Sequence, residues 1–284
     1  VMIKSHKATR SKLIKRLKSD FKIGLSGMPI ENNLMEFHSI MEWIRPEVIP
    51  SFHRFRNRYI TYGWDGKISG YRNLEELHLL TSPYILRRTK EEVLSELPPK
   101  IYTDFPLEFT TESKKAYEAI CNEFLLWLKD QTGKNWQSSA LEKMIRLRQF
   151  VEFPEIVGFD KLNNVKLDWL KDIYSVVDKL VVFTFFKGSI DLLKKEFNTD
   201  FVLTGDTPNQ NRIKIVDRFN EASKGIFLLT DAGKFGINIT GANNIVQYGQ
   251  FFNPAVMKQR EDRLHRIGQK NVVNVLSPYI IGTV

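Results

Sequence analysis

The sequence predicts an α/β protein in which helices flank a parallel β-sheet, preceded by a mainly helical region. From about residue 167 onward, short apolar segments alternate with helical ones, and residues 180–186 are apolar except for Thr184. A continuous apolar run is typical of a strand buried on both faces. The alternation itself favours a parallel sheet covered by helices. The length of 284 residues fits two domains of roughly 100–150 residues each.

The first hundred residues predict a short strand among helices. Leu13, Ile14 and Leu17 form one apolar stripe of a basic helix. Residues 21–25 are expected to form a strand, and residues 33–88 to be helical, with breaks at two prolines and within the glycine-containing segment 63–70. Paired prolines at 98 and 99 stop a helix and stiffen an extended chain. We therefore place a domain boundary near residue 100 and expect domains at residues 1–100 and 101–284.

The second domain begins with an expected strand at 101–109 and a helical insertion at about 112–150. The alternating part then predicts strands at 180–186, 201–203, 226–229 and 245–248, with helices at 190–197 and 210–219.

Composition excludes several classes of protein. One cysteine, and histidines without ligand-like spacing, exclude a disulfide framework and predict no metal site of the protein's own. No apolar stretch reaches the roughly 20 residues needed to cross a bilayer, so we expect a soluble, intracellular protein without a membrane partner. The net charge of +9 suggests an anionic partner, but the first 22 residues hold eight basic residues and one acidic residue, which leaves only +2 for the rest.

Ligands of open parallel sheets bind at the carboxyl ends of strands, and four segments qualify for that position. Three are loops after expected strands, at residues 25–34, 203–208 and 230–238. Backbone N–H groups and hydroxyls of the second loop are suited to holding a phosphate. The fourth is residues 259–269, where a helix would place Gln259, Asp262, Arg263 and Arg266 on one face. Two guanidiniums presented together suit the charge of a transferring phosphoryl group. Taken singly, each segment is equally typical of a capped turn or a surface salt-bridge helix.

Together, in this order, the segments resemble the Swi/Snf-like DNA-translocating ATPases of helicase superfamily 2. Leu25-Ser26-Gly27-Met28-Pro29-Ile30-Glu31-Asn32-Asn33-Leu34 is similar to the family's third helicase motif. Residues 86–90 and 97–100 are similar to its inter-lobe segment, and residues 181–186, 203–220, 230–238 and 259–269 to motifs IV, IVa, V and VI. The ending His265-Arg266-Ile267-Gly268-Gln269 is the most specific of these signatures.

The resemblance implies a helicase-like translocase with two RecA-like lobes, in which this chain supplies the remnant of the first lobe and the whole second lobe. It implies ATP and Mg²⁺ as cofactors, bound between the lobes, and double-stranded DNA gripped by its phosphates without sequence specificity as the partner. By position in the motifs, the implied catalytic residues are Arg263 and Arg266, with Arg266 as the arginine finger. Nucleotide-binding roles fall on Gly236, Gln259 and Asp262, DNA-binding roles on Thr204, Gly205 and Thr230, and coupling of hydrolysis to lobe movement on Ser26 and Gly27.

The chain also departs from the family pattern. Met28, Lys234 and Phe252 replace a usual threonine, glycine and tryptophan. The sequence contains neither the phosphate-binding G-x-x-x-x-G-K-[ST] loop nor the Asp-Glu pair that holds magnesium. We therefore expect the chain to be a fragment that does not hydrolyse ATP alone. A nucleic-acid-binding or regulatory module without ATPase activity stays open as an alternative, as does a strand-separating helicase.

Overall fold

The computed structural model describes residues 3–94, 96–129, 136–231, 237–251 and 253–283. It divides into two compact units, residues 1–93 and residues 94–284, each described here by itself. The division falls a few residues before the boundary expected near residue 100. None of the described helices is both long and apolar enough to cross a membrane.

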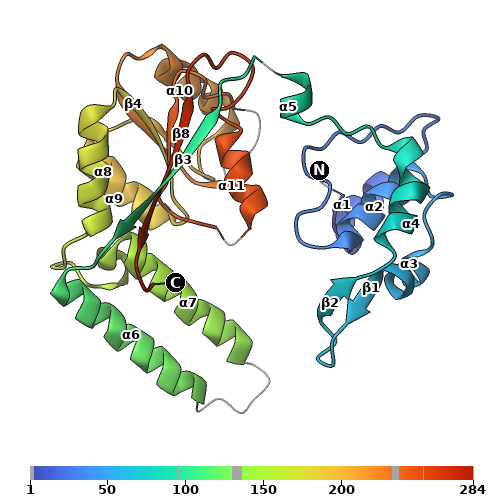
Figure 1. Ribbon diagram of the computed structural model, residues 1–284, viewed down its shortest axis with the longest axis horizontal. Coiled ribbons are helices and arrows are strands. Elements are labelled where there is room, and N and C mark those ends of the chain that lie inside the picture. The colour runs from blue at the N-terminus through green and yellow to red at the C-terminus, as the bar shows by residue number, and fades with distance from the viewer. Residues whose placement is uncertain (1–2, 95, 130–135, 232–236, 252, 284) are drawn as a thin grey trace. The chain divides into compact units, whose positions relative to one another are not determined.

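The first unit is mainly helical (Figure 1). Its elements are α1 (Thr9–Lys15), α2 (Leu34–Ile44), α3 (Phe52–Tyr59), β1 (Ile60–Tyr62), β2 (Ile68–Tyr71), α4 (Leu74–Thr81), the 3-10 helix η1 (Ser82–Tyr84) and α5 (Lys90–Val93). Helix α2 begins where the side chain of Asn33 accepts a hydrogen bond from the Met35 N–H. Its buried face packs against α3 and α4 in a small core of Leu34, Met41, Ile49, Phe55, Tyr59 and Leu77.

The structure adds to one prediction for this unit and contradicts another. The helical region breaks within residues 63–70 as expected, but the antiparallel pair β1 and β2 around this break was not expected; it forms because alternating apolar residues flank a turn in which Gly66 adopts a φ of +72°. Residues 21–25, expected to form a strand, lie in neither a helix nor a strand. The two strands that the structure describes in this unit pair with each other and not with residues 21–25, and Phe21, Ile23 and Leu25 stay 87%, 77% and 88% exposed.

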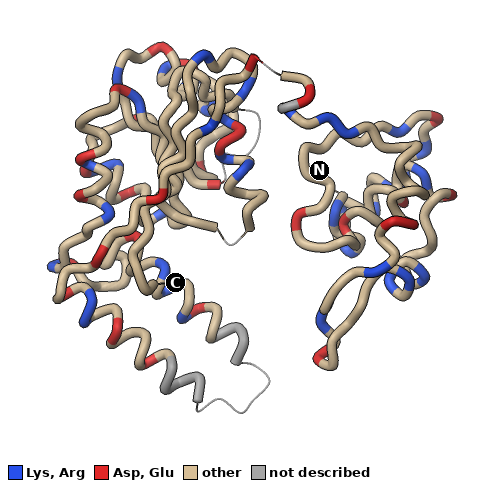
Figure 2. The backbone as a smooth tube through the Cα atoms, in the orientation of Figure 1, with Lys and Arg blue, Asp and Glu red and all other residues tan. Residues whose placement is uncertain are grey.

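The second unit confirms the predicted α/β architecture with a RecA-like parallel sheet (Figure 1). Six parallel strands lie in the order β3-β8-β7-β4-β6-β5. They are β3 (Lys100–Leu107), β4 (Lys179–Phe183), β5 (Val202–Leu203), β6 (Gly225–Leu229), β7 (Asn244–Gln247) and β8 (Val273–Ile280). The strands of the sheet centre are almost without charged residues (Figure 2), as burial on both faces requires.

Helices cover both faces of this sheet. They are α8 (Val165–Val176), α9 (Lys187–Phe197), α10 (Asn209–Glu221) and α11 (Pro254–Glu261). Alternate residues of β4 enter different cores: Val181 and Phe183 pack with α10 on one face, while Leu180 and Val182 pack with α8 and α9 on the other. The sheet is thereby fixed on both sides, which makes its carboxyl edge a rigid support for the loops that follow the strands.

The expected helical insertion consists of two helices, α6 (Thr111–Lys129) and α7 (Trp136–Glu152), followed by the 3-10 helix η2 (Pro154–Val157). The pair extends away from the sheet (Figure 1). Tyr117, Leu147 and Phe150 form their shared core with Ile280 at the end of β8. The insertion is therefore attached to the end of β8, and Glu152 at the end of α7 also joins it to the segment after β4 by accepting from the Phe185 N–H and the Ser189 hydroxyl.

Candidate functional site

Three neighbouring strands are each followed directly by a buried threonine. Thr184 follows β4, Thr230 follows β6 and Thr204 follows β5. The Thr184 N–H donates to the carbonyl of Leu229 over 3.0 Å, and the Thr230 N–H donates to that of Leu203 over 3.2 Å. The structure therefore brings two residues expected to bind DNA, Thr204 and Thr230, to one edge of the sheet, beside Thr184, which the sequence did not single out.

The loop after β5 is a compact turn closed by its own side chains. The Thr204 N–H donates to the Thr207 hydroxyl over 3.0 Å, and the Asp206 N–H donates to the Thr204 hydroxyl over 3.3 Å. Arg212 on α10 secures the turn by donating to the Thr207 carbonyl over 2.9 Å. These amides are thus used within the turn, contrary to the expectation that this loop holds a phosphate through its N–H groups. Gly205 lies exposed at its tip.

A buried arginine connects the loops at this edge. Arg260 on α11 is 2% exposed, and its Nε and Nη2 donate to the two carboxylate oxygens of Asp231 over 2.9 and 3.1 Å. Its Nη1 donates to the side-chain oxygen of Gln247 over 3.0 Å and to the carbonyl of Gly249 over 2.7 Å. Its Nη2 also reaches the carbonyl of Thr184 at 3.4 Å. One side chain therefore joins α11 to the ends of β4, β6 and β7.

Two aromatic rings also contact Arg260, whose guanidinium lies 5.2 Å from the ring centres of both Phe183 and Phe251. Sequence reasoning missed Arg260, although it stands three residues before Arg263 and six before Arg266. Nothing in that spacing distinguishes a buried arginine from an exposed one. The available signal is Asp231, a carboxylate two residues after the end of an apolar strand, which requires a partner if it lies near the core.

The expected helical face of residues 259–269 is wrong beyond residue 261. Gln259 lies on α11, which ends at Glu261, whereas Asp262, Arg263 and Arg266 lie in the turns that follow. The four side chains are therefore not aligned along one helix.

The helix ends because the chain turns into the core. Leu264 is fully buried and packs with the residues between the sheet and α10. The Arg263 and Leu264 N–H groups reach back only three residues, over 3.1 and 3.0 Å. The carbonyl of Arg263 accepts instead from the Ile239 N–H over 2.9 Å. Burial of Leu264 and this contact outweigh continuation of the helix.

The two predicted catalytic arginines nevertheless lie close enough to repel each other. Burial lowers the pKa of Arg263, the charge of Arg266 lowers it further, and the carboxylate of Asp262 opposes both effects. Arg266 is held from the preceding loop, where the side chain of Asn238 and the carbonyl of Ile237 accept from its Nη1. An anion bound between the guanidiniums would remove the cost of holding two like charges together.

The residues around the arginines also anchor the start of β3. The carboxylate of Glu261 accepts from Lys100 Nζ over 2.6 Å and from the Tyr102 hydroxyl over 2.8 Å. A nitrogen of the His265 ring lies 2.8 Å from the carbonyl of Pro98. These contacts hold the start of β3, and Pro98 before it, against the turns that carry Arg263 and Arg266.

The other predicted residues lie elsewhere. Gly236 falls outside the described residues. Ser26 and Gly27 belong to the first unit, where the Ser26 hydroxyl accepts from the Met28 N–H over 3.1 Å. They thus lie on a different unit from the arginines.

Arg263 and Arg266 of the second unit are chemically suited to bind the phosphate part of a nucleotide. The two guanidiniums offer paired donors of the kind that bind phosphate oxygens. For magnesium the fit is poorer, because Asp231, a carboxylate at this edge, already pairs with Arg260.

Comparison with known families matches this architecture. Residues 1–156 match the SNF2-related domain, and residues 165–268 match the helicase conserved C-terminal domain. An uncharacterized ATP-dependent helicase of Mycoplasma genitalium is 31% identical over 96% of the chain, and a putative ATP-dependent helicase/translocase of Bacillus subtilis is 28% identical over 99% of it. The chain spans 27% and 32% of the lengths of these two relatives.

A solved structure gives the same result. The SWI2/SNF2 ATPase core of Sulfolobus solfataricus, solved in complex with double-stranded DNA, is 30% identical with a TM-score of 0.57, and the match covers 99% of this chain and 62% of that one. The matched domains and the parallel sheet confirm the resemblance found in the sequence. The chain therefore belongs to the SNF2-related family of helicase-like ATPases.

Proposed function

We propose that this chain is part of an ATP-driven translocase on double-stranded DNA, in which residues 101–284 form the second motor lobe and residues 1–100 the end of the first. The observation that carries this proposal is the pair Arg263 and Arg266, two partly buried guanidiniums whose mutual repulsion an anion would relieve. They lie in the turns between α11 and β8, next to residues 237–239, which precede β7.

In this proposal the arginines bind the terminal phosphate of ATP, with Arg266 as the arginine finger. Arginine in that role stabilises the charge of the transferring phosphoryl group. Bound ATP with Mg²⁺ supplies the phosphoryl group and the metal that neutralises part of its charge. Asp262 orients the guanidiniums by its charge, Gln259 and Gly236 contribute to the nucleotide site, and Ser26 and Gly27 couple hydrolysis to movement of the lobes.

Double-stranded DNA is the proposed substrate, gripped by its phosphates at Thr204, Gly205 and Thr230. Two of these residues lie at adjacent strand ends, a rigid position for contacting successive phosphates of one strand. Contacts to phosphates carry no sequence information, which a protein that moves along DNA requires. The Sulfolobus relative solved with double-stranded DNA supports this choice.

The test is Arg266→Ala in the full-length protein, with exposed Arg146 on α7 replaced by alanine as the matched control. We expect DNA-stimulated ATP hydrolysis to fall by about 1000-fold or more, because an arginine finger contributes roughly 10³–10⁵ to the rate. DNA affinity, measured by fluorescence anisotropy, should stay within about twofold of the parent and of the control, since no proposed DNA contact is removed. Unchanged turnover in Arg266→Ala would refute the assignment.

A second measurement separates translocation from strand separation. We expect duplex DNA to stimulate hydrolysis and a labelled strand not to be released from naked duplex. Robust release of the strand would favour a strand-separating helicase instead. Residues 1–284 contain no phosphate-binding loop, so we expect no hydrolysis from them alone, and measurable turnover by this piece would contradict that part of the proposal.

A further inference from the structure

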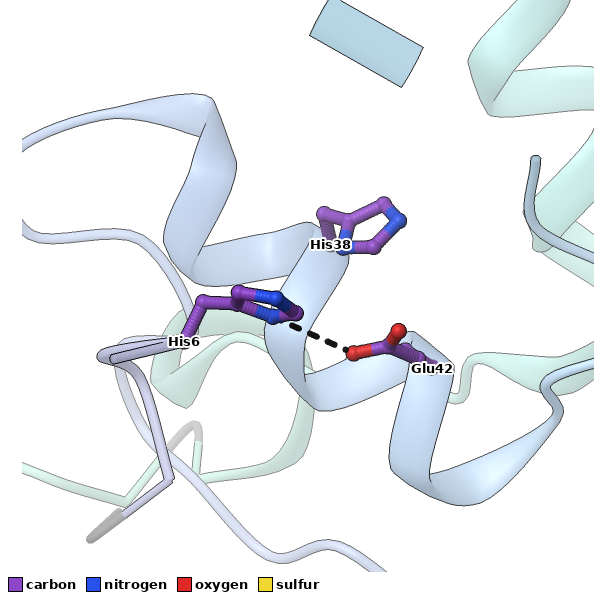
Figure 3. Close-up of side chains that lie close together, drawn as sticks. All are labelled: His6, His38 and Glu42. Atoms are coloured by element: carbon purple, nitrogen blue, oxygen red, sulfur yellow. Dashed lines mark ion pairs between the residues drawn. The ribbon is translucent and has the colours of Figure 1, made fainter. Parts of the chain in front are cut away.

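The first unit brings together three metal-binding side chains that are far apart in the sequence. His38 and Glu42 stand one turn apart on α2, and His6 approaches from the segment before α1 (Figure 3). One potential ligand atom from each lies within 4.8 Å of the other two. His6 Nδ1 and Glu42 Oε2 are 3.4 Å apart. Spacing alone did not suggest this group, because the fold creates it from residues 6 and 38.

His38 is held in the form that binds a metal. Its Nε2 lies 2.9 Å from the carbonyl of Pro50, and because a carbonyl can only accept, Nε2 carries the hydrogen and Nδ1 carries the free lone pair. His38 is fully buried and its Nδ1 has no hydrogen-bond partner among the described residues. Burial lowers the pKa of this ring, which keeps it neutral. Histidines that bind metals are oriented in this same way, by donating the other ring N–H to a carbonyl or carboxylate.

His6 is also held in place, because its ring stacks on Phe52 with the ring centres 4.5 Å apart and the planes at 4°. The side chains of His6 and Glu42 keep 39% and 31% of their surface exposed, so an ion can enter from solvent and retain a water molecule. Metal–ligand bonds of about 2.0–2.2 Å place the ligands of a tetrahedral Zn²⁺ site roughly 3.3–3.6 Å apart. The 3.4 Å between His6 and Glu42 satisfies this requirement without rearrangement.

Lys15 is the group that competes with a metal for Glu42. Its ammonium lies 2.5 Å from Glu42 Oε2 and 3.0 Å from the Ser39 hydroxyl. Through these contacts Lys15 neutralises the carboxylate and lowers the pKa of Glu42, against the effect of burial. A metal ion and this ammonium repel each other, so binding must displace Lys15 or leave it only one of the carboxylate oxygens.

We propose that His6, His38 and Glu42 form a binding site for a divalent transition metal of the Zn²⁺ class, completed by water. Two imidazoles and one carboxylate favour Zn²⁺ over Mg²⁺, which prefers oxygen ligands. The ion would join the segment before α1 to α2, two elements that the Ser39 hydroxyl already links by donating to the carbonyl of Ile3.

The test measures binding of Zn²⁺ to the full chain by competition with a chromophoric chelator, and binding of Co²⁺ by its visible absorption. We expect one site, and tetrahedral absorption bands when Co²⁺ binds. His6→Phe retains the stack on Phe52 and should weaken Zn²⁺ binding by roughly 100-fold or more, since even the groups that orient a ligand contribute 10–100-fold. Glu42→Gln should behave in the same way. The exposed His53 on α3, replaced by alanine, is the control and should bind as the parent does.

Lys15→Met is the decisive variant, because it removes only the competitor. We expect it to bind Zn²⁺ at least several-fold more tightly than the parent and to lower the melting temperature of the metal-free chain. Absence of Zn²⁺ binding in both the parent and Lys15→Met would overturn the proposal. Binding that His6→Phe and Glu42→Gln leave unchanged would also overturn it, provided circular dichroism shows both variants folded.

Discussion

Replacing Arg260 by methionine tests whether the buried guanidinium organises the carboxyl edge of the sheet. The substitution removes the two hydrogen bonds to Asp231, whose side chain is 16% exposed, and the bonds to Gln247 and Gly249. Breaking a buried ion pair from one side typically costs about 3–5 kcal/mol, because the remaining charge stays unpaired. We therefore expect the free energy of unfolding of the second unit to fall by about 3–5 kcal/mol.

The partner variant Asp231→Asn should cost less, since an amide oxygen still accepts one bond from the guanidinium. In the double variant the unpaired carboxylate no longer exists, so its cost should be smaller than the sum of the two single costs by about 1–3 kcal/mol. Arg218→Met on α10 is the matched control. That exposed side chain stacks on Phe201 at 5.7 Å, and its loss should cost under about 1 kcal/mol.

The chain has two units, so a single unfolding curve would mix two transitions. Hydrogen exchange of peptides from β6 and β7, followed as a function of urea, reports the second unit alone. A cost below about 1 kcal/mol for Arg260→Met would refute the reasoning. Strict additivity of the two single variants would also refute it, because it would mean that the two side chains do not interact.

Two other features of the second unit lead to predictions. A Cβ at Gly249 would lie 2.2 Å from the carboxylate of Glu152 and 2.5 Å from the Phe185 nitrogen, so Gly249→Ala should destabilise this unit by about 1–3 kcal/mol; equal stability by the same exchange measurement would contradict this. Burial lowers the pKa of Lys166 to about 8, so the folded state binds fewer protons than the unfolded state between pH 8 and 10.5, and the stability of the unit should rise with pH there. Urea titrations at several pH values should show that the free energy of unfolding rises with pH in this range, and that Lys166→Met reduces this rise. An equal rise in Lys166→Met would contradict the prediction.

The strands of the sheet show what a sequence can predict locally. The segments that became β4, β6 and β7 were recognised because each is a short apolar run that packs on both faces. Strand β8 was missed because it contains Ser277 and Pro278. Its pairing with β7 involves only residues 274–276, so Pro278, which has no N–H, lies where β3 is its neighbour and β7 no longer pairs with it. Whether a strand can accept a proline at this position depends on how far its two neighbouring strands extend, and no local sequence pattern gives that information.

The candidate site shows a similar limit. Its residue types were recognised from motifs, and Thr204 and Thr230 do meet at one edge. The role of Arg260 was not recognised, because its partners are contributed by three separate strand ends, one of them 76 residues away. His6 and His38 also meet only through the packing of α2 against an earlier segment. Contacts of this kind depend on the tertiary structure, whereas motif spacing reports only the neighbours along one helix or loop.

Residues 21–25 make the same point for secondary structure. Phe21, Ile23 and Leu25 alternate as in a strand with one apolar face, yet the segment forms no strand and all three side chains are exposed. Residues 180–183 are also apolar, and there the backbone bonds to β6 and β7 while helices cover both faces. The difference lies in the neighbours, because a strand acquires its hydrogen bonds and its buried face only from adjacent elements. A local apolar pattern therefore favours a strand, and pairing with neighbouring strands decides whether the segment becomes part of a sheet.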